Sequence, residues 1–156
     1  MNLHWSPKSP YVRKVMMCAI ELGIDDKISL TRSVAAMLKP NPAIMRDNPF
    51  SKIPTLVLDS GEALFDSRVI CEYLNDVAGG HLLPAAGAAR WQDLRWQAFG
   101  DALLDALILW RNERERDAPL APLIAAFGMK VDAALLQLEN EATALGAAQF
   151  PKVRSR

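Results

Sequence analysis

The sequence predicts an α/β domain built on one mixed β-sheet, followed by a shortened all-helical domain. Short apolar runs alternate with helical patterns in the first half of the chain, which is typical of strands that alternate with helices. After Leu83-Pro84 the composition changes to long helical patterns without strand signals. We therefore expect a first domain at residues 1–79, a linker at 80–87 and a partial all-helical domain at 88–156.

A proline-rich loop separates the first predicted strand from the first predicted helix. Met1–Trp5 is mostly apolar and suits a strand, whereas the prolines in Ser6–Pro10 interrupt strand pairing. The apolar residues that follow repeat with helical spacing. Ser9 then occupies the N-cap position, with a proline as the first helical residue, and Gly23 stands where a helix would end.

The rest of this domain is predicted to add a strand, a short helix, a β-hairpin and a last helix. Ile28–Leu30 suits the second strand, and Val34–Leu38 suits a short helix that Pro40 and Pro42 would end. The hairpin and the last helix are expected at Ile53–Leu58, at Ala63–Phe65, and from Asp66-Ser67 to Gly79-Gly80. The order is β-α-β-α-β-β-α, which predicts a single mixed sheet with helices on its faces.

Two long helices are predicted in the second domain. The first runs from Ala88 to about Arg116 and contains Trp110. A break at Asp117-Ala118-Pro119 separates it from the second, which runs to about Gly146.

Composition and charge argue against several function classes. The formal net charge is +0, and the basic stretch Lys152–Arg156 is too short to indicate nucleic-acid binding. Cys18 and Cys71 lie far apart without C-x-x-C spacing, so we expect no disulfide framework and a cytoplasmic location. His4 and His81 are isolated, so we expect no metal site. No signal peptide is visible, and the longest apolar run is shorter than the roughly 20 residues that a membrane span needs.

Ser9 could hold an anion at the start of the first long helix. Free backbone N–H groups and the positive end of the helix dipole favour a negative charge there. A thiol with a pKa near ~8.5 would then ionise more readily, and a shift of about two units, worth roughly 2.7 kcal/mol, would make the thiolate its major form. Taken alone, a plain N-cap is the more common role of such a serine.

Two further features could bind other parts of the same ligand. A cis bond at Ile53-Pro54 would turn the main chain of Ile53 outward to pair with an extended peptide, whereas a trans proline would only begin the strand. At Asp66-Ser67 the helix N-terminus and the Ser67 hydroxyl could hold a carboxylate, and Asp66 could accept from an ammonium group, with plain capping as the alternative. The three features together fit a short peptide-like molecule with a thiol, an amine and carboxylates, a description that glutathione meets.

Three motifs carry a resemblance to a known family. They are S-P-Y-V-R-K-V at Ser9–Val15, N-P-F-S-K-I-P-T-L at Asn48–Leu56 and F-D-S-R-V-I-C-E-Y-L at Phe65–Leu74. In order and spacing the chain resembles the glutathione S-transferase family, in particular its serine-type, bacterial-like members. The resemblance implies a thioredoxin-like fold for residues 1 to about 83, and the first helices of an all-helical domain for 84 to about 148.

The resemblance also implies roles for individual residues. Ser9 matches the serine that contacts the glutathione sulfur, and would be the catalytic residue. Ile53, ahead of a cis Pro54, matches the position whose main chain pairs with the cysteinyl part. Asp66 and Ser67 match the pair that holds the γ-glutamyl end. Lys52 or, as a weaker candidate, Lys39 would contact the glycyl carboxylate. An electrophile pocket could be lined by Trp5, Tyr11 and Trp110, for which core packing is the alternative.

By this resemblance we expect a cytoplasmic, homodimeric detoxification enzyme that conjugates the glutathione thiolate to small electrophiles. Glutathione would be a co-substrate, with no metal, nucleic-acid or membrane partner. Family members usually continue further, whereas here Phe150-Pro151 is followed by a short basic tail, so we expect exposed apolar surface. The alternative is a non-catalytic glutathione-binding or interaction protein on a truncated transferase scaffold. A thiol-disulfide oxidoreductase would by resemblance need a cysteine where Ser9 stands.

Overall fold

The computed structural model describes residues 1–80 and 82–145. The chain divides into two compact units, Met1–Asp93 and Leu94–Arg156. The domain limits expected from the sequence, with a linker at 80–87, stay a prediction. His81, Gly146, Phe150-Pro151 and the basic tail lie outside the described residues.

The first unit contains one four-stranded mixed sheet, as expected, in the order β2-β1-β3-β4. β1 pairs with β2 in parallel and with β3 in antiparallel orientation, and β3 pairs with β4 in antiparallel orientation. Its elements are β1 (Asn2–Trp5), α1 (Pro10–Glu21), a 3-10 turn (Asp25–Lys27), β2 (Ser29–Arg32), α2 (Pro42–Met45), β3 (Thr55–Val57), β4 (Ala63–Leu64) and α3 (Ser67–Val77). The hairpin strands are shorter than predicted, and β2 lies slightly later in the chain.

The start and the end of α1 agree with the sequence prediction. Ser9 is the N-cap, and its Oγ accepts a hydrogen bond of 3.2 Å from the backbone N–H of Val12. Pro10 is the first helical residue, where its missing N–H costs nothing. Gly23, with φ 69°, follows the C-cap in the left-handed conformation that favours glycine.

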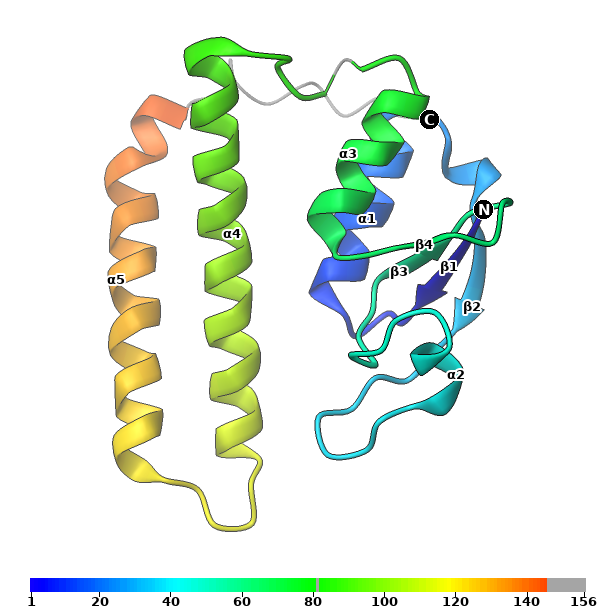
Figure 1. The fold of residues 1–156 in the computed structure, drawn as a ribbon. Coiled ribbons are helices and arrows are strands. Elements are labelled where there is room, and N and C mark those ends of the chain that lie inside the picture. Colours follow the sequence, from blue (N-terminus) through cyan, green and yellow to red (C-terminus); the bar gives the residue numbers. More distant parts are fainter. Residues whose placement is uncertain (81, 146–156) are drawn as a thin grey trace. The chain divides into compact units, whose positions relative to one another are not determined.

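The core of the first unit lies between the sheet and two adjacent helices. α1 and α3 pack against each other (Figure 1). From the sheet, Leu3 and Leu56 are partners in the β1–β3 register, and both are fully buried. Val15 of α1 and Leu74 of α3 are fully buried in the same cluster, so this apolar layer fixes both helices on the sheet.

The short helix predicted at Val34–Leu38 is wrong. Val34 and Ala35 are irregular, and Met37 and Leu38 form a turn between the bridge partners Ala36 and Lys39. Leu38 is 95% exposed, so no buried face supports a helix there. The short helix is α2, which begins at Pro42, a residue interpreted from the sequence as a stop. Asn41 caps it by accepting from the N–H of Ala43 at 2.9 Å, and a proline after such a cap begins a helix rather than ending one.

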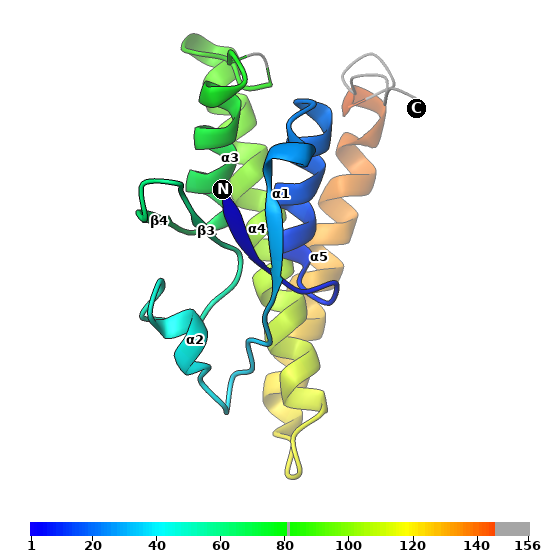
Figure 2. The same ribbon diagram turned by 90° about the vertical axis from the view of Figure 1, so that its right-hand side faces the viewer.

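The second unit is built on two long helices, which the sequence predicted with closely similar limits. α4 spans Gly87–Arg114 and α5 spans Ala121–Leu145. The boundary between the two units falls inside α4, between Asp93 and Leu94. The two helices run side by side in opposite directions (Figures 1 and 2). Near one end Arg95 and Glu141 form an ion pair at 2.9 Å. At the other end the buried Glu113 accepts from the N–H of Leu120 at 2.8 Å, so a side chain of α4 holds the start of α5.

One described helical segment, Ala121–Ala142 in α5, is long and apolar enough to cross a membrane by length and composition alone. The expectation from the sequence concerned uninterrupted apolar runs, which this finding does not contradict. Charged residues such as Lys130 and Asp132 interrupt the apolar residues of this helix, so the sequence shows no long apolar run there.

Replacing Leu74 by alanine should lower the free energy of unfolding by about 2–5 kcal/mol, because the residue is fully buried and truncation leaves a cavity. Val77→Ala, on the same helix but 48% exposed, should cost less than about 1 kcal/mol. Urea titration of both variants measures the difference, and equal costs would contradict the assignment of the core.

Candidate functional site

The strand pairing brings the three sequence motifs to one end of the sheet. β3 pairs with β4 through Leu56↔Leu64 and Val57↔Ala63. If the same antiparallel register is extended beyond the end of β4, Pro54 lies opposite Asp66. β1 ends at Trp5 next to the start of β3, and the loop to Ser9 leaves from the same end. Residues that lie dozens of positions apart in the chain therefore gather around the first residues of β3.

Ser9 is half-exposed at this end of the sheet and keeps a hydrogen to donate. Its Oγ accepts from Val12, and its own N–H donates to the carbonyl of Ser6 at 3.2 Å, which fixes the turn before α1. A hydroxyl that accepts one hydrogen bond still carries its own O–H donor. Ser6 is 8% exposed, so Ser9 is the more accessible of the two hydroxyls.

The peptide bond between Ile53 and Pro54 is cis, which resolves the choice that the sequence left open. The loop before it is organised by Asn48, which is 2% exposed. The Asn48 amide donates to the carbonyl of Lys52 at 3.2 Å and to Oγ1 of Thr55 at 3.0 Å, and its oxygen accepts from the N–H of Phe50 at 3.1 Å. The buried Asn48 side chain thus holds the conformation of the loop that leads to Ile53.

Asp66 and Ser67 form the start of α3. Asp66 is the N-cap, and its Oδ1 accepts from the N–H of Arg68 at 2.9 Å. Ser67 is the first helical residue and is 2% exposed. The helix N-terminus at this position can hold a negative charge, and the second oxygen of Asp66 can still accept a donor.

An aromatic contact that the sequence did not reveal connects these two motifs. The rings of Phe50 and Phe65 meet edge to face, with their centroids 6.5 Å apart. Phe50 belongs to the loop before Ile53, and Phe65 directly precedes Asp66. Phe50 is 71% exposed, so this pair presents an apolar surface beside the motifs.

His4 is isolated in the sequence, but the fold gives its side chain two hydrogen-bonding neighbours. It is 6% exposed, and its Nδ1 and Nε2 lie 2.8 Å from Oγ of Ser33 and from Oδ2 of Asp47. These partners follow β2 and α2, so the imidazole joins β1 to both ends of the segment that contains Lys39. Partners 29 and 43 residues away leave no local signal in a sequence.

The remaining predicted contacts lie in different surroundings. The side chains of Lys39 and Lys52 are exposed, and Tyr11 is half-buried in the first turn of α1. Trp5 is half-buried, packs against the core and carries the guanidinium of Arg32 5.3 Å from its ring centroid, which is consistent with the packing alternative.

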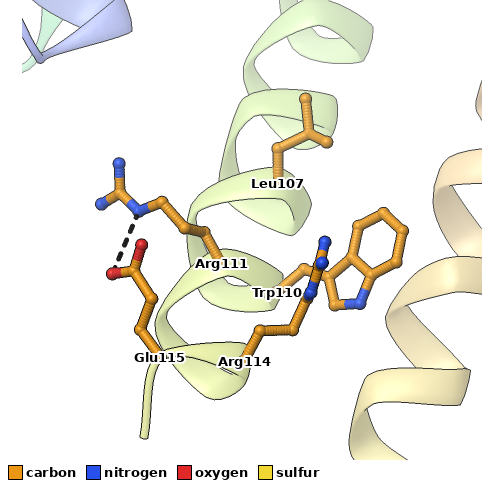
Figure 3. Close-up of a pocket in the computed structure, with 5 residues that line it drawn as sticks. All are labelled: Leu107, Trp110, Arg111, Arg114 and Glu115. Carbon is orange, nitrogen blue, oxygen red and sulfur yellow. Dashed lines mark ion pairs between the residues drawn. The ribbon is translucent and has the colours of Figure 1, made fainter.

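Trp110 lines a pocket on α4 in the second unit, together with Leu107, Arg111, Arg114 and Glu115 (Figure 3). The Arg114 guanidinium lies 5.6 Å from the centre of the Trp110 ring, and Arg111 pairs with Glu115 at 3.9 Å. The indole N–H is buried and has no hydrogen-bond partner among the described residues. The pocket therefore combines an aromatic wall with two positive charges and one negative charge.

Within residues 1–80 and 82–145, no cluster of three or more histidine, cysteine or acidic side chains is arranged to hold a metal ion.

Comparisons with known proteins agree on one family. Residues 8–77 match the model of the glutathione S-transferase N-terminal domain. A glutathione transferase family member from Pseudomonas fluorescens Pf-5, solved with bound glutathione, is 40% identical with a TM-score of 0.87, over 92% of this chain and 72% of that one. A glutathione S-transferase from Methylobacillus flagellatus KT, solved with GSH bound, is 34% identical with a TM-score of 0.80, over 90% of this chain and 69% of that one.

A curated relative is the uncharacterized GST-like protein YibF of Escherichia coli K12. It is 31% identical over 120 residues, which are 76% of this chain. The match spans 57% of the length of that relative.

Replacing Asn48 by alanine should lower the free energy of unfolding by about 1–3 kcal/mol, because it leaves buried loop groups without partners. Asn2→Ala is the matched control, since its amide donates to Thr31 in an exposed position and its loss should cost less than about 1 kcal/mol. Urea titration compares the two variants. A cost for Asn48→Ala no larger than that of the control would rule out its organising role.

Proposed function

Because the chain belongs to the glutathione transferase family, with a thioredoxin-like domain followed by a helical domain, we propose that it binds glutathione and conjugates the glutathione thiolate to small electrophiles. The observation that carries the proposal is the gathering of Ser9, Ile53-Pro54 and Asp66-Ser67 at one end of the sheet. The glutathione bound in two relatives of at least 34% identity supports it further.

Ser9 would activate the thiol in this proposal. Its Oγ is held by the N–H of Val12, so the hydroxyl hydrogen is left to donate to a sulfur anion. The start of α1 adds the positive end of its dipole. The glutathione thiol would lose its proton to solvent, and the thiolate would attack the electrophilic atom, so that the covalent chemistry belongs to glutathione and the protein supplies position and charge.

The other contacts would fix the ends of glutathione. We propose that the main chain of Ile53 pairs with the cysteinyl part, that the second oxygen of Asp66 accepts from the γ-glutamyl ammonium, and that Ser67 donates to the neighbouring carboxylate. Lys52, or Lys39, would pair with the glycyl carboxylate. A homodimer, a cytoplasmic location and a role in detoxification complete the proposal. Trp5, Tyr11 and Trp110 remain the candidate contacts for the electrophile.

The catalytic part of the proposal is tested at Ser9. Ser9→Ala should lower kcat/KM for a chlorodinitrobenzene by about 10- to 100-fold, because it removes a donor aimed at the thiolate. Ser9→Thr keeps a hydroxyl and a cap, and Ser6→Ala changes the buried neighbouring serine, so both should retain most of the activity. Equal rates for the wild type and Ser9→Ala would remove Ser9 from the mechanism. Retention on immobilised glutathione without turnover by the wild type would favour the binding-only function.

The binding part is tested at Ser67, the proposed contact that most needs an experiment because the residue is only 2% exposed. Ser67→Ala should raise the Kd for glutathione about tenfold, since hydrogen bonds to charged groups are among the stronger ones. Ser60→Ala, in the exposed turn before β4, is the control and should leave the Kd unchanged. Isothermal titration calorimetry measures both, and an unchanged Kd for Ser67→Ala would exclude a contact by its hydroxyl.

A further inference from the structure

The fold brings together two thiols that the sequence keeps apart. Cys18 lies on α1 and Cys71 on α3, and these two helices pack against each other (Figure 1). The Cys18 sulfur is 3.9 Å from the carbonyl oxygen of Cys71, although the two residues are separated by 53 positions. Neither cysteine is in a disulfide. The pair could not be predicted from the sequence, because the two cysteines lack C-x-x-C spacing.

The two thiols differ in access to solvent. Cys18 is half-buried, so part of it can be reached from outside, whereas Cys71 is 5% exposed. A hydrogen bond from the Cys71 side chain lowers the pKa of Cys18, and Lys14 one turn earlier on α1 lowers it further, against the opposing effect of burial. A thiolate is the form of cysteine that attacks disulfides. Cys18 is thus both the more accessible thiol of the pair and the one with the lowered pKa.

We propose that Cys18 and Cys71 form a thiol-disulfide exchange site, in which Cys18 attacks a small-molecule disulfide of the glutathione disulfide class and Cys71 resolves the product. The Cys18 thiolate bonds to one sulfur of the small molecule, whose S–S bond breaks, and the leaving thiolate takes up a proton. Cys71 then loses its proton and attacks the Cys18 sulfur. A Cys18–Cys71 disulfide forms and the second small thiol leaves, so the protein loses two thiol hydrogens while one disulfide is reduced to two thiols.

This site is distinct from the one proposed for conjugation. Cys18 lies nine residues beyond Ser9, about 13 Å along the axis of α1 at the usual rise per residue. The exchange needs neither Ser9 nor bound glutathione. It would operate even if the conjugation function were absent, so the two proposals can fail independently.

The experiment follows the products of oxidation on the folded full chain. Reduced protein is incubated with glutathione disulfide, quenched with acid, alkylated and analysed by intact mass and peptide mapping. The wild type should lose two alkylatable thiols and yield a peptide pair cross-linked between Cys18 and Cys71. Cys71→Ala should stop at one glutathionyl group on Cys18, and Cys18→Ser should leave Cys71 unmodified. Hydroxyethyl disulfide should give the same cross-link, which separates the reaction from any glutathione site.

Two lysine variants test the activation of Cys18 without altering either thiol. Lys14→Met should slow the first step about twofold, the usual size of a partly exposed charge interaction one helical turn away. Lys27→Met, on the exposed 3-10 turn, should have no effect. Circular dichroism confirms that each variant is folded. Unmodified wild-type protein, a stable unresolved adduct on the wild type, or equal modification of Cys71 in Cys18→Ser would each overturn the proposal.

Discussion

The antiparallel pairing of β3 between β1 and β4 is the constraint on which the candidate site depends. This pairing puts the start of β3 beside the end of β1 and the end of β4, and the loops that contain Ser9 and Asp66 leave from those ends. A slip of one residue would turn the buried pair Leu3 and Leu56 away from the helices, so burial of the core and assembly of the site are fixed by the same register.

The features that could be predicted from the sequence are local ones. The cap at Ser9, the left-handed Gly23 and the limits of α4 and α5 follow from side chains within a few positions of each other, and they were predicted correctly or nearly so. The position of α2 was missed, because a proline both begins and ends helices and only the packing decides which.

The features that could not be predicted depend on contacts between distant segments. Nothing near His4 in the sequence points to Ser33 or Asp47, and nothing near Cys18 points to Cys71. The cis state of Pro54 is likewise decided by the folded loop, because sequence alone permits both isomers. The motifs therefore identified the candidate residues, whereas the supporting contacts could be seen only in the folded structure.

Asn48 and Thr55 have a consequence for how the loop before Pro54 can change. Both side chains donate to the carbonyl oxygen of Lys52, at 3.2 and 2.9 Å, which uses both lone pairs of that oxygen. Lys52 therefore supports the loop through its main chain alone, while its exposed side chain makes no described hydrogen bond or ion pair. A substitution at Lys52 can therefore change the charge at this edge of the protein, and with it the anionic groups that are attracted there. The backbone of the loop stays the same.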